Sequence, residues 1–364
     1  MSGIHRLKFM IYSLKSVRNA QVQNQTVLLR VDLDVPIENS IIKDDTRLNA
    51  WLPTLEFLLK NEAKVVIVGH LGRPEGKEEE FSLKPVVNWL AQKINLSATE
   101  KKIGEFDGWQ LSDSVSVLEN IRFYPEEEKN DPQFSQRLAS IAQIFVNDAF
   151  ATVHRAHASI EGVTHFLPSF AGLRVLEEVE VLSAILENPK RPLCVIIGGA
   201  KIETKLPLVK KMCQFADDVL VGGEIAKNNQ ILSEVSKEKA QNCSLLVADL
   251  NEVQTDITPE SLEKFIQVAG ECQTIVWNGP MGLIPDSDNP SQTTFYLAKM
   301  LSESNAYRVV GGGDTVGFLK EHNLLNNFSF ISTGGGAMLE FLSGEKLPGL
   351  VALEQNSPQI QSYS

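Results

Sequence analysis

Short apolar runs recur along the whole chain and alternate with longer segments whose apolar residues are spaced as in helices. Continuous runs of this kind are typical of strands that are buried on both faces of a parallel sheet covered by helices. The pattern therefore predicts an α/β fold with parallel strands. The predicted strands are 27–31, 65–68, 115–118, 144–146, 193–197, 219–221, 275–277, 308–310 and 328–331.

The length of the chain and one helical segment near its midpoint predict how the fold is divided. At 364 residues the chain exceeds the usual size of a single hydrophobic core, so we expect two domains. Residues 172–187 have the spacing of one amphipathic helix that ends before Pro189. We expect an N-terminal domain over 1–172, a connecting helix over 173–188, a C-terminal domain over 189–345, and a polar, weakly structured tail over 346–364.

Composition and charge exclude several classes of function. Hydrophobic residues make up 43% of the chain and charged residues 22%, as in ordinary soluble globular proteins. No apolar run approaches the ~20 residues of a membrane span, and residues 1–10 do not form a secretory signal. The net charge of −12 argues against a nucleic-acid partner. The four cysteines contain no CxxC pair, which favours reduced thiols in the cytoplasm over disulfides or zinc.

A phosphate-binding turn is indicated where the run 193–197 ends in Gly198-Gly199. The chain continues into a predicted helix with Lys201 and Lys205 four residues apart. Glycines let backbone amides approach an anion, and a helix N-terminus favours negative charge. Both lysines lie on one helical face, where they can reach one polyphosphate. The alternative is an ordinary tight turn followed by two solvated lysines.

Charged side chains and histidines also follow four predicted strands of the first half. Because the carboxyl ends of parallel strands meet at one sheet edge, we expect these side chains to form one site. Arginine binds phosphate or carboxylate through its planar fork, so the site is predicted to hold a polyanion. Two histidines three residues apart could instead share a metal, but no carboxylate or cysteine cluster accompanies them. The side chains are Asp32, Asp34, Arg47, His70, Arg73, Arg122, His154, Arg155 and His157.

These motifs, taken in order, resemble the phosphoglycerate kinase family. The resemblance extends from about residue 20 to about residue 350 and rests on long, individually specific segments. It implies two Rossmann-like, three-layer parallel-sheet domains that are joined by a central helix and face an open cleft. The segments are 30–36, 70–74, 118–123, 146–157, 198–205, 275–282, 311–315 and 332–337.

The resemblance also implies an activity and its partners. A phosphoglycerate kinase reversibly transfers a phosphoryl group from 1,3-bisphosphoglycerate to ADP in glycolysis, giving 3-phosphoglycerate and ATP. We therefore expect a cytoplasmic monomer that uses Mg²⁺ together with ADP or ATP, and whose domains close on a hinge. We expect neither a nucleic acid nor a membrane among its partners.

Carried over residue by residue, the family's acidic-substrate site lies in the first domain. Asp32 and Asp34 would face the hydroxyl and carboxyl end of the glycerate. Arg47 would reach the phosphoryl group being transferred, and Lys201 of the second domain would act on the same group. The 3-phosphate would be held by His70, Arg73, Arg122 and Arg155. The whole implied set is Asp32, Leu33, Asp34, Arg47, His70, Leu71, Gly72, Arg73, Arg122 and Arg155.

The nucleotide site is implied in the second domain, where glycines again follow predicted strands. Lys205 would contact the nucleotide phosphates, and Asp314 would bind Mg²⁺, a cation that prefers carboxylate and phosphate oxygens. The structural alternative is that Asp314 and Thr315 only cap a helix. The implied set is Gly199, Lys205, Gly222, Asn278, Pro285, Gly312, Gly313, Asp314 and Thr315.

Several positions depart from the family pattern. Asp34 stands where the family has asparagine, and an ionised carboxylate cannot donate a hydrogen bond to an acidic substrate. Pro285 replaces the glutamate that binds the ribose, Glu224 replaces a glycine beside the base, and the segment 225–260 is shorter. The alternatives to an ordinary kinase are thus a degenerate binding protein with weak or no activity and a kinase with a changed nucleotide preference.

Overall fold

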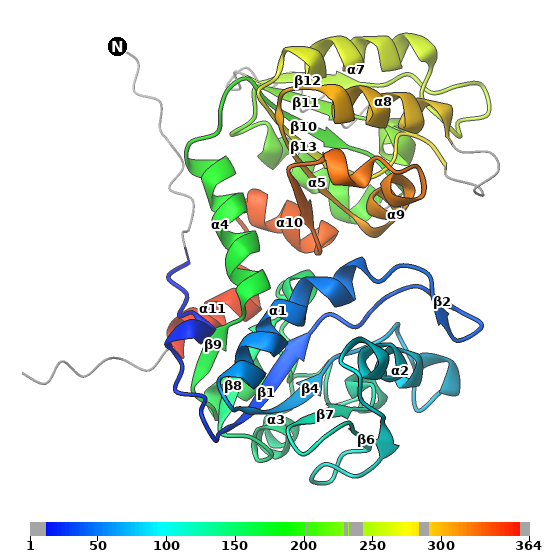
Figure 1. The fold of residues 1–364 in the computed structure, drawn as a ribbon. Helices are drawn as coiled ribbons and strands as arrows, with labels where there is room; N and C mark the ends of the chain where they lie inside the picture. Colours follow the sequence, from blue (N-terminus) through cyan, green and yellow to red (C-terminus); the bar gives the residue numbers. More distant parts are fainter. Residues whose placement is uncertain (1–11, 201, 229–231, 233–242, 284–290, 357–364) are drawn as a thin grey trace, which may run out of the picture. The chain divides into compact units, whose positions relative to one another are not determined.

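The computed structural model of the chain describes residues 12–200, 202–228, 232, 243–283 and 291–356 (Figure 1). Lys201 and Pro285, both predicted site residues, lie outside the described residues. By their internal contacts the described residues form two compact units. The N-terminal unit contains residues 12–180 together with 346–356, and the C-terminal unit contains residues 181–345.

The N-terminal unit is built on a seven-stranded sheet in the order β5-β6-β7-β4-β1-β8-β9. Its parallel strands are β1 (Thr26–Val31), β4 (Lys64–Val68), β7 (Val115–Leu118), β8 (Ile144–Asp148) and β9 (Ser169–Ala171). Two short antiparallel strands at one edge are β5 (Thr99–Glu100) and β6 (Gly108–Gln110). Outside this sheet, β2 (Ile37–Glu38) pairs with β3 (Ile41–Ile42).

Two helices of the N-terminal unit, α1 (Thr46–Lys60) and α2 (Lys84–Lys93), pack on one face of this sheet. Alternate strand residues such as Val27 point to that face and share a buried core with Trp51 of α1. Because Arg47 lies in the first turn of α1, this packing positions one of the predicted site residues. A third helix of the unit is α3 (Pro132–Ala139).

The C-terminal unit is built on six parallel strands in the order β12-β11-β10-β13-β14-β15. The chain proceeds outward from β10 to β12 and then returns to start β13 on the other side of β10. Such a reversal of strand order leaves a crevice at the carboxyl ends of the two central strands. The strands are β10 (Leu193–Ile197), β11 (Asp218–Val221), β12 (Ser244–Val247), β13 (Thr274–Asn278), β14 (Tyr307–Gly311) and β15 (Phe330–Ser332).

Helices cover the sheet of the C-terminal unit, whose central strands β10, β11 and β13 are almost entirely buried. Side chains of α7, α8 and α9 share one hydrophobic core with alternate residues of β10 and β13, and α5 packs against α10 (Figure 1). Burial on both faces explains the continuous apolar runs in these strands. The helices are α5 (Ile202–Met212), α7 (Pro259–Glu271), α8 (Gln292–Glu303), α9 (Gly313–Glu321) and α10 (Gly335–Leu342).

The predicted α/β class with parallel strands is confirmed, and each predicted apolar run overlaps a strand. The elements that the pattern did not predict are short or half exposed. They are the hairpin of β2 and β3, the edge strands β5 and β6, and the outer strands β9 and β12. Except for β12, which has the apolar run 245–247, these strands lack the continuous apolar run that marks a strand buried on both faces.

The predicted connecting helix is present as α4 (Leu173–Glu187). Asp148, at the end of β8, accepts hydrogen bonds through Oδ1 from the backbone amides of Arg174 (2.8 Å) and Val175 (3.0 Å). These bonds satisfy two amides that have no acceptor within the helix. Burial raises the pKa of Asp148 to about 7. The contact-based boundary between the units falls inside α4, at residues 180 and 181.

The weakly structured tail predicted over 346–364 is wrong for its described part. Pro348–Gln355 form the helix α11, which belongs to the N-terminal unit and buries Leu350 and Leu353 completely. Gly349 donates its amide to the carbonyl oxygen of Val153 (2.8 Å). The sequence pattern did not indicate this helix because its buried side chains span only two helical turns and are flanked by polar residues.

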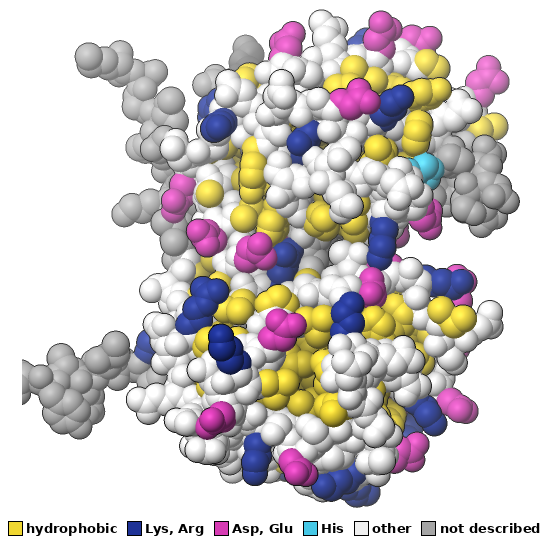
Figure 2. Space-filling view, in the orientation of Figure 1, with side chains coloured by type: hydrophobic (Ala, Val, Ile, Leu, Met, Phe, Trp, Pro, Cys, Tyr) yellow, Lys and Arg dark blue, Asp and Glu magenta, His cyan; other side chains and the backbone are white. Residues whose placement is uncertain are grey.

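Within the described residues, no helix is long and apolar enough to cross a membrane. On the face shown in Figure 2, Lys and Arg side chains are interspersed with Asp and Glu side chains.

The packing of α11 predicts that Leu350→Ala destabilises the N-terminal unit by about 2–5 kcal/mol, since it leaves a cavity at a fully buried site. Denaturant unfolding followed by tryptophan fluorescence measures this, because Trp51, Trp89 and Trp109 all lie in that unit. The control is Gln355→Ala, an exposed position on the same helix. Equal midpoints for the two variants would contradict the packing of α11.

Candidate active site

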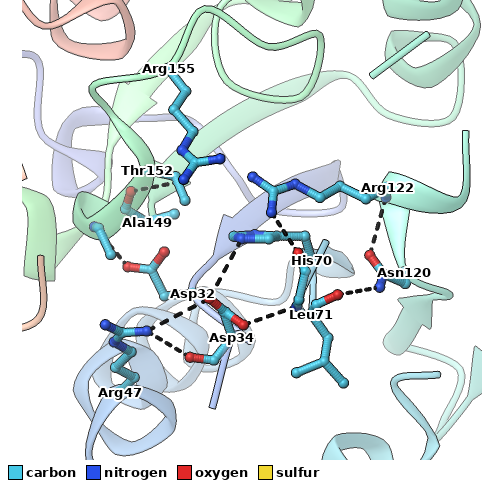
Figure 3. A network of polar contacts seen from close by, with 12 residues as sticks. Asp32, Asp34, Arg47, His70, Leu71, Asn120, Arg122, Ala149, Thr152 and Arg155 are labelled. Carbon is cyan, nitrogen blue, oxygen red and sulfur yellow. Dashed lines mark hydrogen bonds and ion pairs between the residues drawn. The ribbon is translucent and has the colours of Figure 1, made fainter. Parts of the chain in front are cut away.

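Polar side chains gather at the carboxyl edge of the sheet in the N-terminal unit (Figure 3). They come from the loops that follow β1, β4, β7 and β8, the four strands for which the sequence predicts a common site. Hydrogen bonds join these loops to one another, so their relative positions are fixed before any ligand binds. We call this cluster the anion site; its central members are Asp32, Asp34, Arg47, His70, Arg122 and Arg155.

Asp34 connects three parts of the anion site. Its Oδ1 accepts a hydrogen bond from the amide of Gly72 (3.0 Å), a glycine with the left-handed φ of 62°. Its Oδ2 lies 3.9 Å from Nε2 of His70 and 4.0 Å from Nη1 of Arg47. The same nitrogen of Arg47 donates to the backbone oxygen of Asp34 (2.7 Å). The guanidinium of Arg47 therefore offsets part of the negative charge that Asp34 brings to the site.

Asp32 is buried and turns toward a different loop. Its Oδ2 accepts a hydrogen bond from the amide of Ala151 (2.9 Å), whereas its Oδ1 has no hydrogen-bond partner among the described residues. Burial raises the pKa of Asp32 to about 6, against the opposing effect of Arg30 and Arg47. A buried acceptor without a partner is rare in folded proteins, so Asp32 is suited to accept a hydrogen bond from a ligand.

Arg30 determines which nitrogen of His70 carries the proton. Nη2 of Arg30 lies 3.1 Å from Nδ1 of His70. Because a guanidinium can only donate, Nδ1 must accept and the ring proton must be on Nε2. Burial lowers the pKa of His70 well below its usual range, and the positive charges of Arg30 and Arg122 lower it further. His70 is thus a neutral ring whose Nε2–H can donate to an anion.

Arg30 is itself held by a buried pair of residues. Its Nε donates to Oγ of Ser159 (3.0 Å), and this hydroxyl donates to Oε1 of Glu127 (2.6 Å). Oε2 of Glu127 accepts from the amide of Ser159 (2.9 Å). Sequence reasoning did not single out these three residues. The signal for Arg30 was present, since a lone arginine inside the apolar run 27–31 requires a buried partner.

Two further arginines reach toward the space beside the His70 ring (Figure 3). The side chain of Arg122 is only 4% exposed; its Nη1 donates to the backbone oxygen of Gly72 (2.6 Å) and its Nε pairs with Glu128 (3.1 Å). Burial lowers the pKa of Arg122 to about 10, which leaves it charged at neutral pH. Nε of Arg155 lies 3.3 Å from Nε2 of His154.

Three other predicted members of the site take different positions. Arg73 is exposed, and its side chain makes no hydrogen bond or ion pair with another described residue. Leu33 and Leu71 bury their side chains in the hydrophobic core, so only their backbone atoms can face a ligand.

Burial lowers the pKa of His154 to about 4 and that of His157 to about 3.

The second group of predicted residues lies at the carboxyl edge of the sheet in the C-terminal unit. Gly198 and Gly199 donate their amides to the backbone oxygens of Asn278 (2.9 Å) and Pro280 (2.8 Å). The expectation that these two amides approach an anion is therefore wrong. The glycines are required for close packing instead, because a Cβ on Gly198 would lie 2.2 Å from the oxygen of Pro280. Gly222 similarly donates its amide to Ile197.

Lys205 extends back from α5 over these glycine turns. Its Nζ donates to the backbone oxygen of Gly198 (2.7 Å), and a Cβ on Gly279 would lie 2.7 Å from the same nitrogen. The absence of side chains at these glycines thus makes room for an ammonium group at the sheet edge. This edge is the topological switch point between β10 and β13, where ligands bind in open α/β sheets.

The N-terminus of α9 lies at the same sheet edge, directly after β14. Its N-cap is Gly312, with a φ of 99°, so the alternative in which Asp314 caps the helix does not hold. Asp314 is exposed in the first turn, and its carboxylate makes no hydrogen bond or ion pair with another described residue. Thr315 is fully buried, and its Oγ1 accepts from the amide of Gly279 (2.9 Å), so it supports the neighbouring turn.

Asn278 and Glu224 complete the described part of this edge. Nδ2 of Asn278 donates to the backbone oxygen of Gly335 (2.9 Å), which joins the turn after β13 to the start of α10. Glu224 follows Gly223 in a short 3₁₀ helix (Gly223–Asn228), and its Oε1 lies 3.4 Å from Nζ of Lys227. Across the described residues, no group of three or more histidine, cysteine or carboxylate side chains could hold a metal ion.

The fold and the two sites define an α/β protein in which charged side chains and glycine turns gather at the carboxyl edge of each of two sheets. The family model for phosphoglycerate kinase matches residues 17–239 and 227–345. The phosphoglycerate kinase of Pelotomaculum thermopropionicum is 38% identical over 390 residues, covering 93% of this chain and 98% of the relative. That of Coprothermobacter proteolyticus is 37% identical over 389 residues, with the same coverage. The chain belongs to the phosphoglycerate kinase family.

Solved structures agree with this assignment. The phosphoglycerate kinase of Coxiella burnetii has a TM-score of 0.76 and 33% identity, covering 94% of this chain and 100% of that one. The enzyme of Pyrococcus horikoshii has a TM-score of 0.79 and 28% identity, covering 94% and 99%.

The geometry around His70 predicts its protonation state. In ¹⁵N-edited NMR of the free protein, His70 should carry its proton on Nε2 and stay neutral at pH values where an ordinary histidine is protonated, because burial beside arginines lowers its pKa. His70→Gln identifies the signals by their loss, and the exposed His165 of the same unit serves as a reference ring. A His70 that titrates near its ordinary value, or that is protonated on Nδ1, would contradict the role of Arg30.

Proposed function

We propose that this chain catalyses the reversible transfer of a phosphoryl group from 1,3-bisphosphoglycerate to ADP, giving 3-phosphoglycerate and ATP, as a glycolytic phosphotransferase. One observation in particular supports this activity. The anion site combines several guanidinium groups and the Nε2–H of His70 with a buried oxygen of Asp32 that has no hydrogen-bond partner among the residues that the structure describes. A ligand with a phosphate at one end and a hydroxyl group at the other satisfies all of these groups.

In the N-terminal unit, each group of the anion site is assigned by its hydrogen-bonding capacity. The guanidinium groups of Arg122 and Arg155 can only donate, and the free nitrogen of His70 is a donor through its Nε2–H; with the exposed Arg73 they would hold the 3-phosphate. Asp32 would accept a hydrogen bond from the substrate hydroxyl through its free Oδ1. Backbone atoms of Leu33, Leu71 and Gly72 would line the same space.

Phosphoryl transfer requires positioning and neutralisation of charge more than covalent help from the protein. Arg47 and Lys201 would neutralise the negative charge on the oxygens of the phosphoryl group in transfer. Lys205, whose side chain extends over the glycine turns, would bind the nucleotide phosphates. The exclusion of water protects the acyl phosphate from hydrolysis. The nucleotide site would be shaped by Gly199, Gly222, Asn278, Gly312 and Gly313. Thr315 would stabilise one of its turns.

The residues at α9 fit a magnesium ion. Mg²⁺ is usually bound by one or two carboxylates together with substrate phosphates, and Asp314 offers one exposed carboxylate at a helix N-terminus. When bound with the nucleotide, the ion supplies further neutralisation of phosphate charge.

Glu224 favours a second candidate, a kinase with a changed nucleotide preference. Its carboxylate follows directly on Gly223, which packs so closely on the turn at Gly199 that a Cβ there would lie 2.5 Å from the Gly199 amide nitrogen. A negative charge beside a polyphosphate weakens its binding, and the pairing with Lys227 offsets part of this effect. Pro285 cannot accept a hydrogen bond from a ribose through its side chain.

We also propose a monomer in the cytoplasm that acts on small molecules. A relative from Arabidopsis thaliana, 37% identical over 396 residues, is named a cytosolic phosphoglycerate kinase. The anion site described here is formed by residues of a single chain, which supports activity without a second copy.

The activity is tested by a coupled assay of ATP formation, combined with calorimetry using ADP, ATP, GDP and 3-phosphoglycerate. We expect turnover with ADP, and we expect Lys201→Ala to abolish turnover while leaving the affinity for 3-phosphoglycerate unchanged. Binding of 3-phosphoglycerate without any nucleotide binding would establish the degenerate binding protein instead. Turnover restricted to GDP would establish the changed preference, and turnover that survives Lys201→Ala would refute the role of this lysine.

Asp34→Asn should tighten the binding of 3-phosphoglycerate by about three- to tenfold, or roughly 1 kcal/mol, because it removes a negative charge from the anion site. The amide can keep the hydrogen bond from Gly72 through its oxygen. Calorimetry measures the change, and Glu38→Gln, which removes an exposed charge from the same unit, is the control. Unchanged or weaker binding would show that Asp34 is fully compensated by Arg47.

A further inference from the structure

We propose that Asp256 is a positioning residue for the nucleotide site. It acts through a series of hydrogen bonds that ends at the turn formed by residues 279–282. The inference rests on the proposed function, since Lys205 would bind the nucleotide phosphates beside this turn. Asp256 lies between β12 and α7, directly before Ile257, which pairs with Leu250 in an isolated bridge. It belongs to neither of the residue sets that the family resemblance implies.

The turn 279–282 connects the neighbouring turns of this sheet edge. The backbone oxygen of Pro280 accepts a hydrogen bond from the amide of Gly199 (2.8 Å), which follows β10. The backbone oxygen of Met281 accepts from the amide of Gly223 (2.9 Å), which follows β11. A displacement of the turn 279–282 would therefore also displace the turns after β10 and β11.

Threonine side chains fix the amides of this turn. Oγ1 of Thr315 accepts from the amide of Gly279 (2.9 Å). Oγ1 of Thr294, in the first turn of α8, accepts from the amide of Met281 (3.0 Å). Thr294 is fully buried, so its hydroxyl proton requires an acceptor within the protein.

Asp256 determines the direction of the remaining hydrogen bonds, because an ionised carboxylate can only accept. The hydroxyls of Ser291 and Thr293 donate to its Oδ2 (2.9 Å) and its Oδ1, respectively. Ser291 has thereby used its one proton, so the hydroxyl of Thr294, 2.9 Å away, must donate to the Ser291 oxygen. The series thus runs in one direction, from the Met281 amide to Asp256.

The carboxylate approaches the turn directly because Gly282 has no side chain. A Cβ on Gly282 would lie 2.2 Å from Oδ1 of Asp256 and 2.8 Å from Oγ of Ser291. An amide in place of the carboxylate would offer one acceptor and one donor, and would leave either Ser291 or Thr293 without an acceptor. Asparagine has the same shape as aspartate, so Asp256→Asn interrupts the series while it preserves the packing.

The test measures the affinities of Asp256→Asn for ADP and for 3-phosphoglycerate by calorimetry on the full chain. We expect ADP to bind about tenfold more weakly, the effect of about one lost hydrogen bond, and the affinity for 3-phosphoglycerate to stay unchanged. Hydrogen exchange at the Met281 amide should become faster by about the same factor. This exchange is measured without a ligand, so it does not depend on the catalytic activity.

A pair of variants tests the series from its other end. Thr294→Val removes the hydroxyl and nearly keeps the shape, so it should weaken ADP binding and speed exchange at Met281 as Asp256→Asn does. Thr294→Ser retains the hydroxyl and should restore both quantities to about the wild-type values. The inference therefore does not depend on the folding of one variant.

Thr258→Val is the matched structural control from the same loop. Oγ1 of Thr258 accepts from the amide of Ser261 (3.2 Å) and caps α7, outside the series. We expect this variant to unfold at a lower denaturant concentration, while its ADP affinity and its exchange at Met281 stay unchanged.

Three results would overturn the inference. Asp256→Asn could bind ADP as the wild type does, or Thr258→Val could lose as much ADP affinity as Asp256→Asn. In the third, exchange at Met281 would be unchanged in Asp256→Asn. A wild-type chain that binds no nucleotide would refute the proposed function and this role together; unchanged exchange at Met281 would refute the hydrogen-bond series alone.

Discussion

The anion site depends on one fully buried cation, the guanidinium of Arg30 in the middle of the sheet. A charge in this position is tolerated only when its donors are satisfied, and removal of one partner from a buried pair costs about 3–5 kcal/mol. Here the donors are used by Ser159, by the backbone oxygen of Val31 and by His70, while Glu127 supplies the opposite charge. The side chain of Arg30 therefore connects β1 both to the loop after β4 and to the loop after β8.

This arrangement determines the chemistry that the site offers. Because Arg30 donates a hydrogen bond to Nδ1 of His70, the ring carries its proton on Nε2, which is left as a donor. The ring stays neutral. Burial also raises the pKa of Asp32, one of whose oxygens has no hydrogen-bond partner within the described part of the chain. The other arginines of the site, Arg47 and Arg122, are oriented by backbone oxygens and carboxylates. Donors of fixed direction around one free acceptor favour a ligand that carries both phosphate and hydroxyl groups.

The proposed nucleotide site of the C-terminal unit is built by a different physical route, through close packing of backbone. The amides of its glycine turns donate hydrogen bonds to backbone oxygens at the ends of neighbouring strands. Because these glycines have no side chains, turns from neighbouring strands can pack closely together. The positive charge at this edge comes from Lys205 and from the dipole at the N-terminus of α9, whose first turn also carries the acidic Asp314. A side chain added at Gly198 or Gly279 would therefore separate the turns before it affected any ligand.

The fold could be predicted from the sequence because strands buried on both faces leave continuous apolar runs, and these runs also indicate where each strand ends. The grouping of Asp34, His70 and Arg122 followed from their positions after such strands. Arg30, Glu127 and Ser159 could not be predicted in the same way, since their hydrogen bonds join positions that are 129 and 32 residues apart and follow no periodicity. The Gly198-Gly199 turn shows the opposite error. The motif correctly indicated a glycine turn at the end of a strand, but it also predicted amides free to bind an anion. In the structure these amides donate to the backbone oxygens of Asn278 and Pro280.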